Sequence, residues 1–452
     1  MSVDSRTGGP RTATEHATAC RELLSGLAER VRLRGADRLA PGDPALLGRV
    51  TAQPLHSEIP LPPFDNSQMD GYAVRAADLA GAAADAPVSL PLGYTAAAGD
   101  PPLEHRPGTA TPVMTGAAIP SGADAVVPIE QALPPRFPEL VRAGRGDRQP
   151  QGSVSFAAKA PLGQFVRRRG SDLEQGSPIL PEGARLTPAR IGALAAAGVA
   201  EVPVVPRVRV LLCSTGDEIA GDPGAVGEPE APGGRTEALP PGRIHDANTP
   251  MLAAALRGVG AEVQVLRVED QPAALHGALA AAAPEIDLVM TTGGISAGAF
   301  EVVREALTPL GVRFLSVAMQ PGGPQGYGTV RFEASAVSNP TSTSTPILCF
   351  PGNPVSAMLS TELFLLPTLR ELAGLVAERP RDTRLLAHAT DSPVGKLQLR
   401  RGCIESDGRV SLSGPSSHLL VGMATADVIA EIPLGVAHAP ENTPVTVWSI
   451  ND

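Results

Sequence analysis

The 452-residue sequence lacks features that would place it in a membrane or outside the cell. It has no apolar run of about 18 residues, the length that a transmembrane helix needs. Its first residues include Asp4, Arg6, Arg11 and Glu15, with no apolar segment of the kind found in a secretory signal. None of its four cysteines belongs to a CxxC pair, so we expect free thiols. These absences predict a soluble, cytoplasmic protein with no membrane partner.

Aromatic residues and positive charge are also scarce. Aromatics make up 3% of the chain, so its cores must consist mainly of Ala, Val and Leu, and the 48 glycines and 47 prolines predict many turns. The net charge is −10, and the one dense basic cluster is Arg-Arg-Arg at 167–169. Nucleic-acid-binding proteins normally present a basic face. We therefore expect no nucleic-acid partner.

The pattern of strands, helices and breakers predicts four domains. Residues 16–56 and 157–204 form an N-terminal helical linker domain, because apolar residues recur at helical spacing after His16 and Thr187-Pro188 starts a further helix. The inserted residues 57–156 are rich in Pro, Gly and short β-prone runs, which predicts a small, mostly-β domain. Residues 205–376 alternate strands and helices, and 377–452 return to short strands typical of a small β-barrel domain.

Residues 205–376 carry the clearest pattern. Apolar segments predict strands at 208–213, 261–268, 287–292, 313–317 and 346–350, and helices are expected from Asn248, Pro272, Phe300 and Pro354. Apolar strands separated by helices predict a parallel sheet covered on both faces. The fold class is therefore α/β and multidomain: a central three-layer parallel-sheet domain, an N-terminal helical/β region and a C-terminal small β domain.

Three loops follow the predicted strands, at the sheet edge where ligands of open parallel sheets bind. They are 214–218 (STGDE), 291–298 (TTGGISAG) and 351–356 (PGNPVS). Glycine lets several backbone amides approach one oxyanion closely. A tight turn would explain any one of these loops alone, but three on one edge predict a site for phosphate or another oxyanion.

Carboxylates follow the same strands: Asp217, Glu218, Asp246, Asp270 and Glu301. Mg²⁺ takes one or two carboxylates together with substrate oxygens, so these residues suit a metal that accompanies a phosphate. Asp246, which precedes a Pro-initiated helix, is expected to cap that helix instead. For Glu218 and Glu301, helix capping and metal or substrate contact remain equal alternatives.

Seven segments, taken in order, resemble the MoeA-type molybdopterin molybdenumtransferases, the bacterial counterparts of the gephyrin E domain. They span residues 62 to 358 and read PPFDNSQMDGYAVR, VMTGAAIPSGADAVV, VRRRGSDLEQG, LLCSTGDEI, IHDANTPMLAAALRGVGAEV, TTGGISAG and FPGNPVSAM. The resemblance implies that the central domain is of the molybdopterin-binding type.

The resemblance further implies a Mg²⁺-dependent transferase of molybdenum cofactor biosynthesis, which inserts molybdate into adenylylated molybdopterin and releases AMP. Six positions match residues important for activity in that family: Asp70, Thr115, Asp172, Glu218, Asp270 and Glu301, of which the last three are the implied metal ligands. The implied substrate-binding residues are Ser214, Thr215, Gly216, Gly293, Gly294, Ser296, Pro351, Gly352, Asn353, Pro354 and Ser356. The implied partners are a second copy of the chain, whose cleft Asp70 and Thr115 approach, the molybdopterin adenylyltransferase and molybdoenzyme chaperones.

The sequence departs from the family pattern at four positions. Glu301 stands where Asp is usual, and Ser316, Gln320 and Gly323 stand where the family usually carries lysines. Arg304 is a candidate to replace the missing positive charge. The departures keep open a catalytically reduced or specialised paralogue, beside an adenylyltransferase-like enzyme or a scaffold. The adenylyltransferase loop typically reads TTGGTG, so TTGGISAG favours insertion; molybdenum and tungsten stay equal alternatives.

Overall fold

The computed structural model describes residues 10–143, 148–219, 226–227, 239–296, 301–331 and 344–450. The chain forms two compact units. Unit 1 comprises residues 1–37, 48–52 and 203–452, and unit 2 comprises residues 38–47 and 53–202. The expected division into four domains is finer than these two units and stays a prediction.

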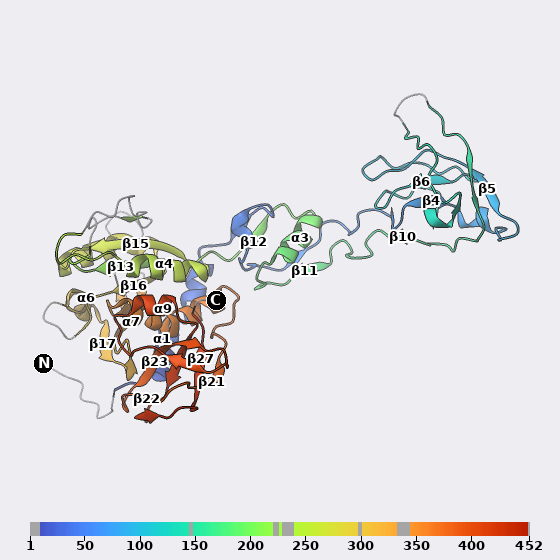
Figure 1. Ribbon diagram of the computed structural model, residues 1–452. Helices are drawn as coiled ribbons and strands as arrows, with labels where there is room; N and C mark the ends of the chain where they lie inside the picture. The colour runs from blue at the N-terminus through green and yellow to red at the C-terminus, as the bar shows by residue number, and fades with distance from the viewer. Residues whose placement is uncertain are drawn as a thin grey trace. The chain divides into compact units, whose positions relative to one another are not determined.

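A seven-stranded sheet in the order β14-β15-β13-β16-β20-β19-β17 forms the middle of unit 1 (Figure 1). Its strands are Arg209–Thr215 (β13), Val226–Gly227 (β14), Glu262–Val268 (β15), Leu288–Thr292 (β16), Arg313–Ser316 (β17), Pro324–Arg331 (β19) and Ser344–Phe350 (β20). The neighbours β15, β13, β16 and β20 are parallel, which confirms the predicted parallel sheet.

Three antiparallel strands extend this parallel centre: β14 beside β15, β19 beside β20, and β17 beside β19. The strand β19 was not predicted, because Gly326 and Gly328 weaken its strand pattern. Packing explains Gly326, since a Cβ added there would lie 2.6 Å from the Phe314 ring and 2.9 Å from the Cys349 Cβ.

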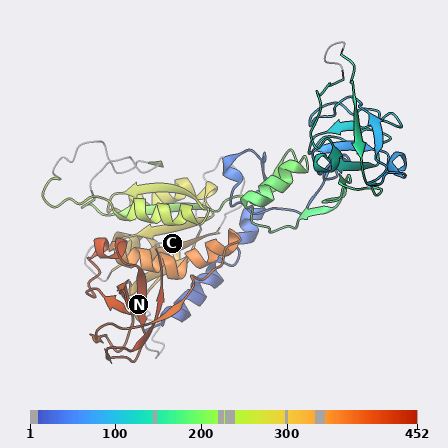
Figure 2. The ribbon, with the colours of Figure 1, turned by 45° about the vertical axis from the view of Figure 1, so that its right-hand side comes forward.

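Helices cover both faces of the sheet, as predicted. They are Ala13–Leu24 (α1), Leu27–Arg32 (α2), Asn248–Gly258 (α4), Pro272–Ala282 (α5), Val302–Leu307 (α6), Pro354–Phe364 (α7), Leu366–Leu372 (α8) and Leu420–Ala424 (α9). Val210 and Leu212 of β13 pack with α1, α4, α7 and α8, whereas Leu211 and Cys213 pack with α5 and α6. Figure 2 shows α4 and α7 along one face. Within the described ranges, no helix has the length and apolar character needed to cross a membrane.

A second sheet of unit 1 has the order β18-β23-β25-β27-β21, with β24 beside β23. The strands of this region are Met319–Gln320 (β18), Asp382–Leu385 (β21), Thr390–Asp391 (β22), Leu397–Ile404 (β23), Val410–Leu412 (β24), Val428–Ile432 (β25), His438–Ala439 (β26) and Pro444–Trp448 (β27). In Figure 1 this sheet lies next to α7 and α9. Its residues Leu399, Ile429 and Trp448 belong to the same core as α7, and β18 comes from the segment between β17 and β19.

Unit 2 is mostly β structure, as predicted for residues 57–156. Two three-stranded sheets, β6-β4-β7 and β5-β9-β8, surround a core that contains Tyr72, Leu79 and Phe156. The strands in this part of the sequence are Asp37–Leu39 (β1), Leu55–His56 (β2), Asn66–Ser67 (β3), Gly71–Val74 (β4), Val88–Pro91 (β5), Thr111–Val113 (β6), Ala125–Pro128 (β7), Ala132–Leu133 (β8), Ser153–Phe156 (β9), Val166–Arg167 (β10), Pro178–Leu180 (β11) and Val202–Val204 (β12). The predicted helix α3 (Pro188–Ala196) begins after Thr187, whose side chain accepts a hydrogen bond from the Arg190 N–H.

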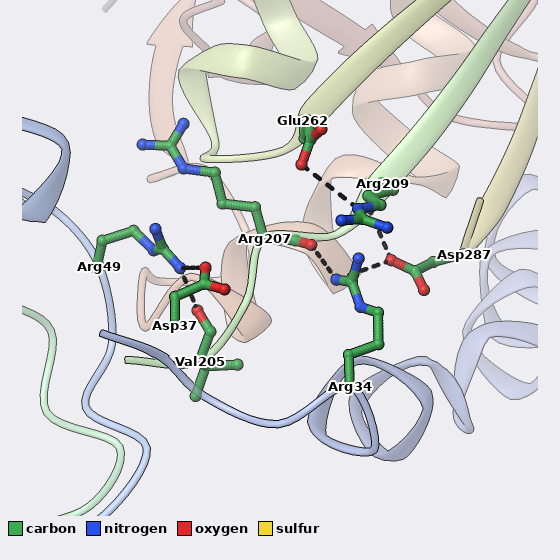
Figure 3. A network of polar contacts seen from close by, with 8 residues as sticks. All are labelled: Arg34, Asp37, Arg49, Val205, Arg207, Arg209, Glu262 and Asp287. Carbon is green, nitrogen blue, oxygen red and sulfur yellow. Dashed lines mark hydrogen bonds and ion pairs between the residues drawn. The ribbon is translucent and has the colours of Figure 1, made fainter. Parts of the chain in front are cut away.

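Charged side chains hold the amino ends of the parallel strands together (Figure 3). Asp287, directly before β16, accepts a hydrogen bond from the Arg209 N–H at 2.8 Å and forms an ion pair with Arg34 at 3.2 Å. Arg34 also donates to the Arg207 carbonyl, and the Arg209 Nε lies 3.6 Å from a Glu262 carboxylate oxygen. The edge at which the parallel strands begin is thus filled by contacts within the chain.

His16 on α1 makes the stability of the fold sensitive to pH. Its ring is fully buried, with Nε2 3.6 Å from the Cys20 Sγ, and it lies edge-on to Tyr327 and Phe364. Burial, helped by the positive charge of Arg11, lowers the pKa of His16 to about 4. An unfolded histidine titrates near pH ~6.5. The folded state therefore excludes a proton that the unfolded state takes up, and stability present above pH ~6.5 falls as the pH drops towards 4.

We expect His16 to account for a loss of roughly 3 kcal/mol in the free energy of unfolding between pH ~7 and pH ~4. In the variant His16→Leu this part of the pH dependence should disappear, because leucine has no proton to gain. Urea unfolding of unit 1 at both pH values measures the difference. His388→Gln, at an exposed histidine, is the control. Equal pH dependence in wild type and His16→Leu would contradict the prediction.

Candidate functional site

The carboxyl ends of the four parallel strands lie along one edge of the central sheet. Ser214 of β13 is paired with Thr292 of β16, and Thr292 is paired with Phe350 of β20. On the other side, Thr215 is paired with Val268 at the end of β15. The three predicted loops and the turn that carries Asp270 therefore leave the sheet side by side, which confirms that they share one edge.

The loops after these strands are in backbone contact. The Gly293 N–H donates to the Phe350 carbonyl at 3.1 Å, and the Thr292 hydroxyl donates to the Pro351 carbonyl at 3.1 Å. Gly293 has a φ of +97°, and a Cβ on it would lie 2.8 Å from the Thr215 carbonyl oxygen. Only glycine allows this approach. The backbones of the loops that follow β13, β16 and β20 therefore lie in direct contact at one place.

Buried oxygen atoms without a protein partner gather at this edge. Among the described residues they include Ser214 Oγ, Thr215 Oγ1 and Asn248 Oδ1, on side chains that are 2%, 5% and 7% exposed. Buried polar groups are nearly always hydrogen-bonded, to protein or to other partners. These atoms suit a site that a polar ligand or ordered water completes.

The third loop opens the helix α7. Pro354 is its first residue, Asn353 is its N-cap, and the Asn353 Oδ1 accepts a hydrogen bond from the Ser356 N–H at 3.5 Å. Free amides at the start of such a helix attract anions. The Asn353 Nδ2 also lies 3.3 Å from the His418 Nδ1, which connects the loop to the segment before α9.

Four carboxylates share this edge. The Asp217 N–H donates to Asp270 Oδ2 at 3.2 Å, and the Asp270 N–H donates to Asp217 Oδ1 at 3.3 Å. Burial and the negative charges of Asp217, Glu218 and Glu301 raise the pKa of Asp270, against the opposing effect of the Asp217 N–H. The other three carboxylates are thus close enough to Asp270 to disfavour its negative charge.

Two of these acidic residues have defined structural contacts. Glu301 precedes α6 and accepts hydrogen bonds from the Ser296 hydroxyl and from the Ser296 N–H, the latter at 2.7 Å. It therefore holds the glycine-rich loop, whose residues 297–298 lie outside the described ranges, as does Phe300, the predicted start of α6. Asp246 accepts a hydrogen bond from the Thr249 N–H at 3.0 Å and so caps the first turn of α4 as predicted, from one residue before the N-cap position Ala247.

The carboxylates fit Mg²⁺ as oxygen donors without forming a complete cage. In the part of the chain that the structure describes, no group of three or more His, Cys, Asp or Glu side chains is arranged to hold a metal ion. Mg²⁺ commonly uses one or two carboxylates and takes its other ligands from water and substrate phosphates. A dication would also offset the repulsion that raises the pKa of Asp270. The ligand set Glu218, Asp270 and Glu301 stays a prediction.

Arg400 is linked through Gln398 to the segment in which the family lysines are missing. The register of β17 and β19 pairs Ser316 with Pro324, which places this segment at the same edge of the sheet. Gln320 accepts a hydrogen bond from the Gln398 Nε2 at 3.4 Å, and Arg400 donates to the Gln398 Oε1 at 3.4 Å. Arg400 and its neighbour Arg401 are 6% and 4% exposed.

Burial lowers the pKa of both Arg400 and Arg401. Arg401 donates to the Gly414 and Ser416 carbonyls at 2.6 and 2.8 Å, and so holds the segment that leads to His418. The sequence gives only a weak signal for these two arginines, a pair of cations inside an apolar strand. Arg304, selected from the sequence, lies 3.5 Å from the Ser296 carbonyl.

In unit 2 the structure joins two of the three predicted catalytic residues. The Thr115 N–H and hydroxyl both donate to Asp70 Oδ1, at 2.6 and 2.8 Å. Both residues are exposed. Asp172 is exposed on another turn, where its N–H donates to the Leu61 carbonyl at 2.9 Å; no hydrogen bond between described residues links its side chain to Asp70.

The neighbourhood of Asp70 is fixed by backbone contacts and by one ion pair. Arg168 contacts Asp65 at 2.8 Å, and Asp65 also accepts a hydrogen bond from the Arg169 N–H at 2.7 Å. The next residue, Gly71, opens β4, and a Cβ on it would lie 2.1 Å from the Val127 carbonyl oxygen. The loop that carries Asp70 therefore ends at a position that only glycine can occupy.

Comparison with known families matches most of the chain. Residues 17–198 match the family model described as MoeA N-terminal region (domain I and II). Residues 212–371 match the model described as probable molybdopterin binding domain. The second match contains all three loops and the carboxylates of the sheet edge.

Similar proteins cover nearly the full length. A protein of Mycobacterium tuberculosis named molybdopterin molybdenumtransferase 2 is 38% identical over 97% of this chain and 98% of its own. A molybdopterin molybdenumtransferase of Synechococcus elongatus is 33% identical over 89% of this chain and 92% of its own. The crystal structure of a molybdopterin biosynthesis MoeA protein of Pyrococcus horikosii superimposes with a TM-score of 0.70 at 26% identity, covering 94% of this chain and 98% of that one.

Proposed function

The chain belongs to the molybdopterin molybdenumtransferases, enzymes of molybdenum cofactor biosynthesis, and we propose that it inserts molybdate into adenylylated molybdopterin with release of AMP. One observation carries the proposal. Glycine-rich loops, with the buried and unpartnered hydroxyls of Ser214 and Thr215, meet carboxylates at a single edge of the sheet. Molybdate and the phosphates of the nucleotide are oxyanions, which suit such loops.

The roles of the residues follow from their chemistry. Ser214, Thr215 and the loops 293–296 and 351–356 bind substrate oxygens. Glu218, Asp270 and Glu301 would hold Mg²⁺ together with the substrate phosphates, and the ion would supply positive charge that makes AMP a better leaving group. In unit 2, Asp70 and Thr115 act as a pair and Asp172 serves the same reaction.

Arginines take the place of the family lysines in this proposal. Arg304 lies at the glycine-rich loop, and Arg400 is linked to Gln320 through the Gln398 side chain. A guanidinium keeps its charge even when buried and presents several donors to an oxyanion. Loss of the lysines at Ser316, Gln320 and Gly323 also supports one alternative, a catalytically reduced or specialised paralogue.

The proposal includes a homodimer, a cytoplasmic location and the protein partners that the resemblance implies, the molybdopterin adenylyltransferase and molybdoenzyme chaperones. Light scattering should give the mass of two chains for the purified protein; the mass of one chain would contradict the homodimer. The cysteines support a reducing location, because Cys20, Cys213 and Cys349 are buried thiols and Cys403 is free.

The experiment that tests the proposal is release of AMP by the purified protein from adenylylated molybdopterin. With Mg²⁺ present, release should depend on molybdate, and sulfate should not replace molybdate. AMP release that is equal without molybdate would indicate a different hydrolytic reaction. No release at all, with the nucleotide still bound, would favour the catalytically reduced paralogue.

A further inference from the structure

We propose that Asn248 is a positioning residue that clamps two loops of the site, the glycine-rich loop after β16 and the Pro351–Ser356 loop after β20. Its Nδ2 donates to the Thr292 Oγ1 at 3.1 Å and to the Gly352 carbonyl at 2.7 Å. The side chain is 7% exposed, and both hydrogens of the amide nitrogen are used. In the sequence this residue stood out only as the start of a helix and as part of the family-like segment 244–263.

Asn248 is free for this role because another residue caps the helix. Asparagine at a helix start usually caps the first turn with its own side chain. In α4 the Thr249 N–H is bound by Asp246 at 3.0 Å. The Asn248 side chain instead reaches the sheet edge, where its partners lie 44 and 104 residues further along the chain.

The clamp continues beyond the asparagine. Thr292 accepts from Asn248 and donates its own hydroxyl hydrogen to the Pro351 carbonyl at 3.1 Å. Close by, a Cβ on Gly352 would lie 3.2 Å from the Gly293 Cα, so the two backbones are already in contact. Asn248 thus fixes the separation of two sets of amides. An oxyanion that bridges both loops depends on that separation, since its affinity comes from donors arranged before it binds.

This inference rests on the proposed function only for its effect on substrate; the clamp itself can be measured without it. Two variants distinguish the role of the Asn248 Nδ2 donor from that of its Oδ1 acceptor. Asn248→Leu removes both polar groups and keeps the branched shape, and Asn248→Asp keeps an oxygen in the Oδ1 position but cannot donate to Gly352. Thr249→Val is the matched control, because it removes a neighbouring hydroxyl that is equally buried, at 3% exposure.

Hydrogen exchange of the full chain is the first measurement. In both Asn248 variants we expect faster exchange in peptides that cover 288–296 and 344–356, with unchanged protection in β13 and β15 and in the Thr249→Val control. Wild-type exchange in Asn248→Asp would show that the Nδ2 donor is not needed and would overturn the clamp. Loss of protection throughout the sheet would also overturn it, because Asn248 would then be a residue for folding alone.

The kinetic constants of AMP release are the second measurement. Loss of one buried donor should raise the KM for molybdate about tenfold in both variants, while kcat falls less than about threefold, because no group that touches the reacting atoms is removed. Unchanged KM despite faster exchange would overturn the role in binding. If wild-type protein releases no AMP, the proposed function fails, and the exchange result still decides whether Asn248 clamps the loops.

Discussion

Replacing Glu218 with glutamine is expected to lower molybdate-dependent AMP release about 100-fold while the melting temperature stays within about 2 °C of wild type. Glu218 is exposed, so its substitution leaves no cavity and removes no core contact. Its charge contributes to the field that raises the pKa of Asp270. Glutamine in its place removes one negative charge that would attract a dication, and the shape of the site stays the same.

The dependence of AMP release on the Mg²⁺ concentration gives a second test. Because the proposed function assigns this charge to metal binding, excess Mg²⁺ should restore part of the activity of Glu218→Gln. Glu269→Gln is the matched control: this exposed glutamate precedes Asp270, and its carboxylate accepts a hydrogen bond from the Gln271 side chain at 3.3 Å. Equal losses of activity and of thermal stability in Glu218→Gln would make Glu218 a structural residue.

Substitution of Gly71 by alanine is expected to destabilise unit 2 by about 4 kcal/mol or more. The added Cβ would lie 2.1 Å from the Val127 carbonyl oxygen and 3.0 Å from the Pro128 Cα. Both neighbours are backbone atoms of β7, which pairs with β4, so no side chain can move aside. Relief requires separation of the two strands and displaces the adjacent Asp70 from Thr115.

Gly81→Ala is the control for this substitution. Gly81 lies in the same unit, and a Cβ on it meets no atom within 4 Å. Denaturant unfolding, followed by a probe in unit 2, should show a loss for Gly71→Ala and a change below about 1 kcal/mol for Gly81→Ala. Similar stability of the two variants would show that β4 and β7 are not held as closely as described.

The strands and the edge of the site were accessible from the sequence because they depend on local patterns. Apolar runs such as Val210–Leu212 predicted buried strands, and the parallel order of these strands then placed Gly293 and Asn353 at one edge. The strand β19 escaped because Gly326, which the sequence presents as a breaker, is there to admit the Phe314 ring. That reason exists only once β17 lies beside β19.

The residues that hold the site together were not accessible in this way. Asn248 had the appearance of an ordinary helix start, and its partners become visible only when α4 packs on β13 and β15 and the Asn248 side chain reaches Thr292 and Gly352. Arg400 and Arg401 were hidden for the same reason, because Gln320 meets Gln398 through a strand pair, β18 with β23, that joins distant parts of the chain. The charge that Asp270 experiences likewise depends on three separate loops.

The shared core of the two sheets in unit 1 has a consequence for shortened versions of the protein. Leu399, Ile429 and Trp448 complete the apolar contacts of the helices that follow the Pro351–Ser356 loop, and β18 needs β23 as its strand partner. A chain that stops after Leu372 would leave these helices uncovered and Gln320 without its anchor. Residues 373–452 are therefore part of the hydrophobic core of unit 1. Their deletion should expose apolar surface and yield an aggregation-prone fragment and not a minimal enzyme.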